Sequence, residues 1–438
     1  MKKFISTVKN IFSIEDLRVR ILNTIGFLII FRLGSFIVLP GVDPSRLGGE
    51  AEGIFGLIDT FLGGAFSNAS IFGLGIMPYI SASIVLQLLT VGVPYFQKMQ
   101  KEGESGRKRI NQITRVLTIA ITVAQGIGYV TATILPTGAV MVSTSLFMFS
   151  SLVLLSAGTM FCMWLGEKIT EKGIGNGISM LIMIGIISRF PGAIIAEGLE
   201  KGTSGMLLLI IEALVLFFVV VGVIALTEAT RRIPVQYAKQ VVGGKVYGGQ
   251  RQYIPIKVNA SGVMPIIFAQ ALMFIPGLVA QSFADKSEFA SSVASAFGDF
   301  TTWQYNVLFA FLIIVFTFFY TAISINPTQI SDDMKRGGGF VPGVKPGEET
   351  AGFIATILDR ITLPGAVMLS LIAVLPAVAN LFGVTRGFAS FFGGTSLLIL
   401  VGVVLDTLQQ IESYLLMRKY EGLMQSGRVK GRSEMISR

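Results

Sequence analysis

The sequence predicts an all-α polytopic membrane protein with ten transmembrane helices, and three observations lead to this fold class. Charged residues make up only 14% of the 438 positions and hydrophobic residues make up 52%, whereas a soluble domain has about 25% charged residues. Ten apolar runs are long enough to cross a bilayer, which takes about 20 residues. The distribution of lysine and arginine gives all ten runs one consistent orientation.

The ten apolar runs define the expected helices. They cover residues 21–39, 71–92, 113–135, 145–166, 174–193, 205–227, 262–282, 303–325, 361–380 and 388–408. The first run is too long for a cleavable signal peptide and lacks a small-residue cleavage site. A segment at 1–20 precedes the runs, a tail at 411–438 follows them, and the longest connecting loops are 228–261 and 326–360.

Basic residues indicate on which side of the membrane each connecting segment lies. Of the 35 Lys and Arg residues, 29 fall in the N-terminal segment, the C-terminal tail and alternate loops, and Arg32 lies inside the first run. Because basic segments stay in the cytoplasm, both termini are expected there. Orientation alone could explain any single basic residue. It needs only a few charges near the helix ends, however, so the two long basic loops are also candidate docking sites.

Ten spans divide into two halves of five, 21–200 and 201–410. An odd number of spans reverses the side on which the second half begins, so the halves are expected to be inverted relative to each other. Inverted repeats place a passage at their interface near the membrane midplane. No convincing sequence repeat relates the two halves, so this architecture rests on the span count.

Composition excludes several kinds of chemistry. The chain has no histidine and one cysteine, Cys162, which removes histidine acid–base catalysis, His/Cys metal clusters and a disulfide within the chain. No Gly-x-x-x-x-Gly-Lys-Ser/Thr motif is present, and the glycine-rich stretch GIGNGIS opens a membrane run instead of following a strand. We therefore expect no metal and no cofactor.

The residues within the runs bear on two classes of membrane protein, coupled solute transporters and membrane-embedded enzymes. A coupled solute transporter usually carries acidic residues or histidine near the midplane, and Glu212 in the sixth run is the one clear candidate. A membrane-embedded enzyme would need a nucleophile constellation or paired carboxylates within the runs, and the runs show neither. We therefore expect the chain not to be an enzyme.

A short apolar segment precedes the second run. The stretch IFGLIDTFLGGAF is too short to span a membrane and is interrupted by Gly63 and Gly64. Ser67, with the asparagine after it, is expected to cap the next helix. The segment either rests on the outer surface or folds back into a central cavity, because irregular backbone at membrane depth must be buried in protein or line a cavity. The second alternative makes it a plug, with Asp59 in a funnel that holds water.

The second run carries an unusual stripe. Ile76, Ile80, Ser83 and Gln87 fall within about 60° of each other on a helix. A stripe that is apolar at the waist and polar toward the cytoplasm suits an aqueous funnel that ends in a hydrophobic constriction. Ordinary packing of i,i+4 neighbours is the alternative.

Six stretches of the sequence carry a resemblance to a known family. They are GIMPYISASIVLQLLTV, KEGESGRKRI, ITEKGIGNGISM, VYGGQRQYIPIKVNASGVMP, INPTQISDDMKRGGGFVPGVKPGE and FFGGTSLLILVGVVLD. In this order, and over nearly the whole chain, they resemble the SecY family of bacterial protein-conducting channels. The resemblance implies two inverted, pseudo-symmetric five-helix halves around a central hourglass pore.

The resemblance also implies the elements that seal such a pore. A ring of isoleucines would form the waist of this pore. Its members would be Ile76, Ile80, Ile182, Ile267 and Ile399, and Ile178 and Ile275 would lie next to it. Stiff β-branched side chains that form no hydrogen bonds make a closed ring a dewetted barrier to ions. The plug corresponds to 55–66, and its central residues are Ile58, Asp59, Phe61, Leu62, Gly63 and Gly64. It would rest beneath the ring on the outer side and leave when a polypeptide enters.

A lateral gate is implied between the second and third spans on one side and the seventh and eighth on the other. Signal sequences and membrane helices would leave through it into lipid according to their transfer free energy. Gln87 matches a polar gate position of the family. Gln125 and Gln270 are candidates from their location, with an interhelical hydrogen bond as the alternative role.

The long basic loops resemble the family's docking site for the SecA motor ATPase and for ribosomal RNA. The candidate residues are Lys245, Arg251, Lys257, Lys345 and Gly347. The family usually has arginine where Lys345 stands, and lysine keeps the charge but loses the planar fork. Basic loops suit a polyanion such as rRNA.

Further partners and the location follow from the same resemblance. The implied partners are the subunits SecE and SecG, signal sequences, nascent chains, membrane lipids and accessory insertion proteins. The implied location is the bacterial cytoplasmic (inner) membrane. Arg32 is read as a structural residue that braces the helices, because an intramembrane arginine is costly unless it pairs inward.

Overall fold

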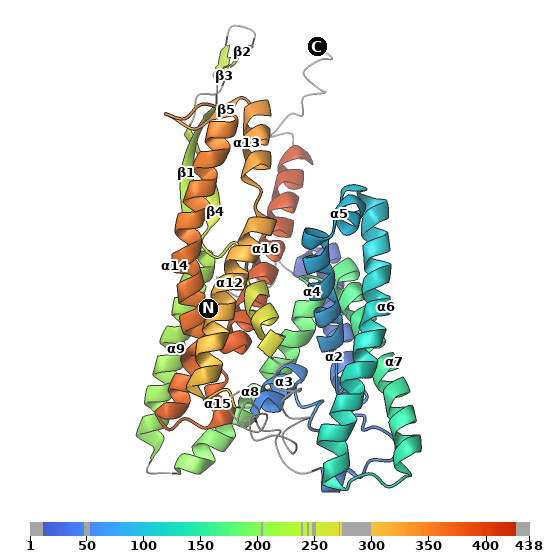
Figure 1. Ribbon diagram of the computed structural model, residues 1–438. Helices are drawn as coiled ribbons and strands as arrows, with labels where there is room; N and C mark the ends of the chain where they lie inside the picture. The colour runs from blue at the N-terminus through green and yellow to red at the C-terminus, as the bar shows by residue number, and fades with distance from the viewer. Residues whose placement is uncertain are drawn as a thin grey trace. The chain divides into compact units, whose positions relative to one another are not determined.

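Most of the chain is helical (Figure 1), in a computed structural model that describes residues 12–47, 53–202, 205–237, 240–242, 245–247, 251–270, 272–273 and 299–425. Among these residues, seven helices are long and apolar enough to cross a membrane. An eighth candidate span is a bent pair, α4 (Met77–Gly92) and α5 (Pro94–Lys101), which meet at 97°. The predicted helical membrane fold is confirmed. The first predicted run lies mainly in α2 (Glu15–Gly34), and the seventh lies only partly within the described residues.

The chain forms two compact units. Unit 1 comprises Met1–Pro191 and Val403–Arg438, and unit 2 comprises Gly192–Gly402. The boundaries fall inside α8 (Gly177–Lys201) and α16 (Gly394–Gln425). Each unit is described separately below.

Helices α6 (Glu104–Tyr129) and α7 (Thr144–Lys172) form much of unit 1. Thr114, Thr118 and Thr122 are buried along one face of α6. Each of these three hydroxyls donates to the carbonyl four residues earlier, at 2.7–2.9 Å, so all three are satisfied within α6. Small side chains at this spacing let membrane helices pack closely. Beyond Tyr129 the helix continues through a π-helical turn and a 3-10 turn.

The second span begins at Met77 rather than at residue 71, which corrects the predicted boundary. Gly75 has φ of 51°, and a Cβ added at Gly73 would lie 2.9 Å from the carbonyl oxygen of Ser70, so these residues form turns that only glycine fits easily. Ile76 occupies the N-cap position. The predicted helix cap at Ser67 is wrong, because the helix begins only at Met77 and the Ser67 hydroxyl donates to Asp59 instead.

The two long loops fold together into a small β-sheet that the all-α prediction missed. Strand β1 (Thr230–Tyr237) pairs antiparallel with β4 (Arg251–Lys257) and with β5 (Gly339–Phe340), in the order β4-β1-β5. A second hairpin joins β2 (Gln240–Val242) and β3 (Lys245–Tyr247). Alternate residues of a strand point to opposite faces, which buries Ile233 and Val235 on one face of β1.

Two helices cover the buried face of this sheet (Figure 1). They are α13 (Pro327–Arg336) and the first turns of α14 (Glu348–Leu381). We call β1, β4, β5, α13 and the start of α14 the sheet module. Its shared core consists of Ile233, Val235, Ile256, Met334, Val341, Ile354 and Leu358.

Unit 2 also contains α9 (Met206–Glu228), α12 (Trp303–Ser324), α15 (Arg386–Ala389) and a helical segment described over 264–270. Helix α12 packs along α14. Helix α14 begins well before the predicted run at 361–380, because its first turns serve the sheet module and are too polar to register as a membrane run.

Candidate functional site

The candidate site is the place in unit 1 where α3 (Gly53–Leu62) and the loop after it contact the neighbouring helices, and we call it the seat of α3. Helix α3 is apolar, and its 10 residues are too few to span a membrane. The helix ends where Gly63 and Gly64 adopt φ values of 62° and 92°, a conformation that glycine reaches at low cost. Phe61 and Leu62 are buried. Of the two alternatives drawn from the sequence, this burial favours a segment that folds back into the protein.

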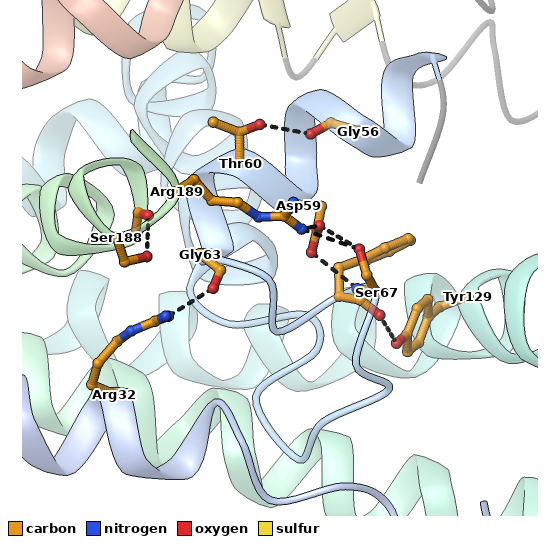
Figure 2. A network of polar contacts seen from close by, with 11 residues as sticks. Arg32, Gly56, Asp59, Thr60, Gly63, Ser67, Tyr129, Ser188 and Arg189 are labelled. Atoms are coloured by element: carbon orange, nitrogen blue, oxygen red, sulfur yellow. Dashed lines mark hydrogen bonds and ion pairs between the residues drawn. The ribbon is translucent and has the colours of Figure 1, made fainter. Parts of the chain in front are cut away.

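Asp59 in the last turn of α3 is 1% exposed and is held from two directions (Figure 2). Its carboxylate forms an ion pair with Arg189 of α8. It also accepts hydrogen bonds from the Ser67 backbone N–H, at 2.9 Å, and from the Ser67 hydroxyl. Arg189 donates to the same hydroxyl at 3.3 Å. A buried carboxylate without a partner would cost several kcal/mol, and the ion pair with Arg189 offsets this cost for Asp59.

Arg32 of α2 holds the turn that follows α3. Its Nη1 donates to the carbonyl oxygen of Gly63 at 2.7 Å, and its guanidinium lies 4.9 Å from the centre of the Phe36 ring. From the sequence, Arg32 is expected to brace the helices. The contact shows that it braces the segment at 63 against α2 (Figure 2).

A tyrosine fixes the other end of the same loop. The buried Tyr129 hydroxyl donates to the carbonyl oxygen of Phe66 at 2.6 Å, and the two rings lie 4.4 Å apart between centres. Three residues on, Ala69 has φ of 46°, in the left-handed region that L-residues rarely occupy. The loop from 63 to 69 is therefore held by side chains from three helices, α2, α6 and α8, and by its own backbone.

The unit 1 members of the predicted isoleucine ring lie beside this seat. Leu62 packs against Gly75, since a Cβ there would lie 2.3 Å from its Cδ2, and Ile76 follows directly. Ile76, Ile80 and Ile182 are all buried, and Ile178 is half-buried. In α8, Ile182 lies one helical turn before Gly185, the residue that contacts the end of α3.

In unit 2, the two described ring candidates lie on neighbouring segments. A Cβ at Gly402 of α16 would lie 2.9 Å from Cγ2 of Val263, so the two segments are in close contact there. Ile399 lies one turn before Gly402 and is buried, and Ile267 lies one turn after Val263 and is half-buried. Ile275 lies outside the described residues.

The three glutamines proposed for the lateral gate have different surroundings. Gln87 is half-buried in α4, and its Nε2 donates to the Ser83 hydroxyl at 3.3 Å. Gln125 is half-buried in α6. Gln270 is buried and donates to the Tyr305 hydroxyl of α12 at 3.4 Å. This is the interhelical hydrogen bond expected as the alternative to a gating role.

The docking candidates belong to the two loops that the sheet module joins. Lys257 is exposed at the end of β4. Lys345 is exposed and forms a surface ion pair with Glu349 at 3.6 Å. Gly347, at φ of 109°, precedes α14. Lys245 and Arg251 lie in β3 and β4, and their side chains are outside the described part of the structure.

Comparison with known proteins identifies the family. A family model described as SecY matches residues 70–408. The chain belongs to the SecY family. A protein translocase subunit SecY of Streptomyces coelicolor is 42% identical over 443 residues, which cover 94% of this chain and 98% of that protein. The resemblance drawn from the six sequence stretches is therefore confirmed.

Solved structures of SecY and Sec61 channels share the fold. The structure of a protein-conducting channel superposes with a TM-score of 0.67 at 17% identity, over 90% of this chain and 92% of that one. A SecY structure described as showing that the plug domain stabilises the closed state has a TM-score of 0.63 at 18% identity, with the same coverage. Canine Sec61 in a ribosome–channel complex has a TM-score of 0.61 at 17% identity and the same coverage.

Glu212 is the acidic residue that would have been compatible with a coupled transporter, and in this structure it is paired with a cation. It forms an ion pair with Lys201, which also pairs with Glu197. Glu197 accepts hydrogen bonds from the backbone N–H and the hydroxyl of Thr385. These contacts tie the end of α8, the start of α9 and the turn before α15 together within unit 2.

Sequence reasoning missed three residues of the α3 seat. The sequence suggests a helix cap for Ser67, presents Arg189 only as one of the charges near the helix ends, and gives no signal for Tyr129. A positive charge near the end of an apolar run was the one available signal for Arg189. Among the described residues, no group of three or more His, Cys, Asp or Glu side chains could hold a metal ion.

Proposed function

We infer that this chain is the channel subunit of a protein translocase, which passes unfolded polypeptides across a membrane and releases apolar segments sideways into lipid. Family membership over residues 70–408 and similarity to translocase subunits over nearly their full length support this function. A channel subunit is not an enzyme, and the work of translocation comes from a partner.

The observation that carries the proposal is the seat of α3. The last turn of a short apolar helix that cannot span a membrane is buried at Asp59, Phe61 and Leu62. This turn and the loop after it are held at Asp59, Gly63 and Phe66 by three side chains from three helices. A plug needs such a defined and reversible seat. In the idle channel this segment closes the outer side, and the isoleucines at 76, 80, 182, 267 and 399 form the waist above it.

The waist works because isoleucine is stiff and apolar. Such a ring fits closely around a passing chain without selecting among side chains by hydrogen bonding. Without a chain, ions would have to shed their hydration to cross it. The barrier matters because a membrane potential of about 100 mV drives each charge with about 2.3 kcal/mol.

Apolar segments leave through the lateral gate. Gln87, Gln125 and Gln270 place a few polar groups along helices that are otherwise apolar. These groups tune how hydrophobic a segment must be before it leaves the channel for lipid.

The sheet module is the platform for cytoplasmic partners. Its core joins the two loops, so exposed basic residues such as Lys257 and Lys345 are displayed on a folded surface. Solved relatives include Sec61 in a ribosome–channel complex. The partners are the ribosome through its rRNA, the SecA motor, the subunits SecE and SecG, signal sequences, nascent chains, lipids and accessory insertion proteins.

The chain is a multi-span membrane protein, and we place it in the bacterial cytoplasmic membrane with both termini in the cytoplasm. The excess of Lys and Arg in alternate loops supports this orientation. The sheet module is formed by two of those basic loops and would face the same side.

Ion conductance of the purified complex in planar bilayers tests the proposal. The wild type is compared with a variant that lacks residues 57–65 and with the double variant Ile80→Gly/Ile182→Gly. Leakage through both variants but not through the wild type supports the plug and the ring. Silence of all three, with insertion and folding verified, would show that the pore assignment is wrong.

A further inference from the structure

The seat of α3 contains a contact between opposite charges that differs in kind from its other contacts. Arg32 and Tyr129 donate to the backbone carbonyls of Gly63 and Phe66, which any plug sequence would supply. Asp59 and Arg189 instead recognise each other by charge. Their side chains are 2% and 24% exposed, so water screens the pair only weakly.

Arg189 also contacts a second point of the same segment. It reaches the Ser67 hydroxyl at 3.3 Å, and that hydroxyl and its own backbone N–H both donate to Asp59. The last turn of α3 and the loop after it are therefore linked to each other and, through one guanidinium, to α8 (Figure 2). When α3 leaves its seat, it loses all of these contacts to Arg189 at once.

We propose that the Asp59–Arg189 ion pair sets the threshold for opening, so that it determines how hydrophobic a segment must be to displace the plug. This inference rests on the proposed channel function. A segment that enters can shift the closed–open equilibrium only by the free energy with which it favours the open state. A more stable seat therefore demands a more hydrophobic segment, and a weakened pair lets weaker segments through.

Transport of graded substrates tests the proposal. The chain, purified in its complex with its partner subunits, is reconstituted in proteoliposomes. It is given one reporter protein whose signal sequence is weakened stepwise by Leu→Ala replacements. The variants are Asp59→Asn, Arg189→Gln, the double variant, and Arg189→Lys, which keeps the charge but not the fork.

Asp43→Asn is the matched control. Asp43 also pairs with an arginine, Arg46, at 3.5 Å, but this pair lies on the surface of unit 1, where the Arg46 side chain is 66% exposed. Hydrogen bonds from Ser45 hold the pKa of Asp43 below its usual range, so the carboxylate is charged during the assay. The control removes a charge of the same kind without touching α3.

We expect Asp59→Asn and Arg189→Gln each to raise transport of the weakest signal about tenfold, which corresponds to about 1.4 kcal/mol. Transport of the strongest signal stays unchanged, because that signal already displaces the plug. The double variant gains no more than either single variant, since one contact is lost in all three. Arg189→Lys falls between them and the wild type, and Asp43→Asn equals the wild type.

Two results would overturn the inference and leave the channel function intact. One is an unchanged ratio of weak-signal to strong-signal transport in all variants, and the other is gains that multiply in the double variant. A wild type that fails to transport even the strongest signal would instead overturn the channel function. If Asp59→Asn does not fold, Arg189→Lys still decides, because it keeps a cation in the seat.

Discussion

Gly185 of α8 lies directly against the backbone of Phe61 at the end of α3, so close that a Cβ added at Gly185 would sit 2.0 Å from the Phe61 carbonyl oxygen. Real Cβ atoms do not approach backbone oxygens this closely, and the clash involves main chain rather than the end of a flexible side chain. The fit of the short helix into its seat therefore depends on the absence of one methyl group.

Gly185→Ala should push α3 out of its seat and make the closed channel conduct ions. The expected cost is about 1–3 kcal/mol, as for other overpacked sites. Conductance in planar bilayers measures the ion leak through the closed channel. The control is Gly192→Ala in the same helix, where no atom lies within 4 Å of the added Cβ. Equal conductance of the two variants would contradict the prediction.

Tyr129→Phe should loosen the loop after α3 without altering its shape. The substitution removes the 2.6 Å hydrogen bond and leaves the Phe66 carbonyl unsatisfied in a buried place, at a cost of about 1–3 kcal/mol. Hydrogen exchange of residues 63–70 should become faster. Tyr95→Phe is the control, since that ring is 65% exposed. Unchanged exchange in Tyr129→Phe would mean that the hydroxyl does not hold the loop.

Ala69→Gly should be better tolerated than the same change at Ala65. Ala69 has positive φ, which costs an L-residue roughly 1–2 kcal/mol and costs glycine almost nothing. The gain is partly offset by the greater freedom of glycine in the unfolded chain. Ala65 is buried without positive φ, so Ala65→Gly brings only the loss. Thermal denaturation of the two variants should show the order, and the reverse order would refute this account of the loop.

Ile354→Ala should loosen the sheet module, because Ile354 is 1% exposed in its core. Removing a buried isoleucine side chain costs about 2–5 kcal/mol. Limited proteolysis should then cut within β1 or β4 sooner, and binding of ribosomes should weaken. Phe353→Ala, at the neighbouring position that is 38% exposed, is the control. Equal cleavage rates for the two variants would count against a shared core.

The apolar spans could be predicted from the sequence because hydrocarbon demands a long run of apolar residues whatever the fold. Boundaries failed where a run contains backbone that is not helical. The stretch from 71 to 76 is apolar enough to be counted with the second span, but the positive φ of Gly75 keeps it in turns. Hydropathy reports solvent preference, and it does not report backbone conformation.

The sheet module was missed for a related reason. Its strands sit in basic loops, and each of β1 and β4 contains a proline, which argues against a strand. The signal that could have revealed β1 was the spacing of Ile233 and Val235 two residues apart, between the polar residues Arg232 and Gln236. The partner strand β5 contributes only two residues, so the sheet depends on contacts far apart in the chain.

The site could be predicted in outline but not in its contacts. Gly63 and Gly64 marked the end of α3 because glycine has a known conformational role. The pairing of Asp59 with Arg189 joins residues 130 positions apart, and no local pattern specifies such a pair. Gly185 in α8 likewise reads as one small residue among many.

Helix α14 runs without a break from Glu348 to Leu381, so one continuous helix connects the sheet module to the helices of unit 2. At about 1.5 Å per residue, its 34 residues make a rod of roughly 50 Å. The rod has a compliant point at Pro364, which cannot donate the helical hydrogen bond to the carbonyl four residues earlier. A torque applied to the module by a bound partner therefore reaches this joint first, and the stiffness of the helix around Pro364 sets how much of it travels farther along α14.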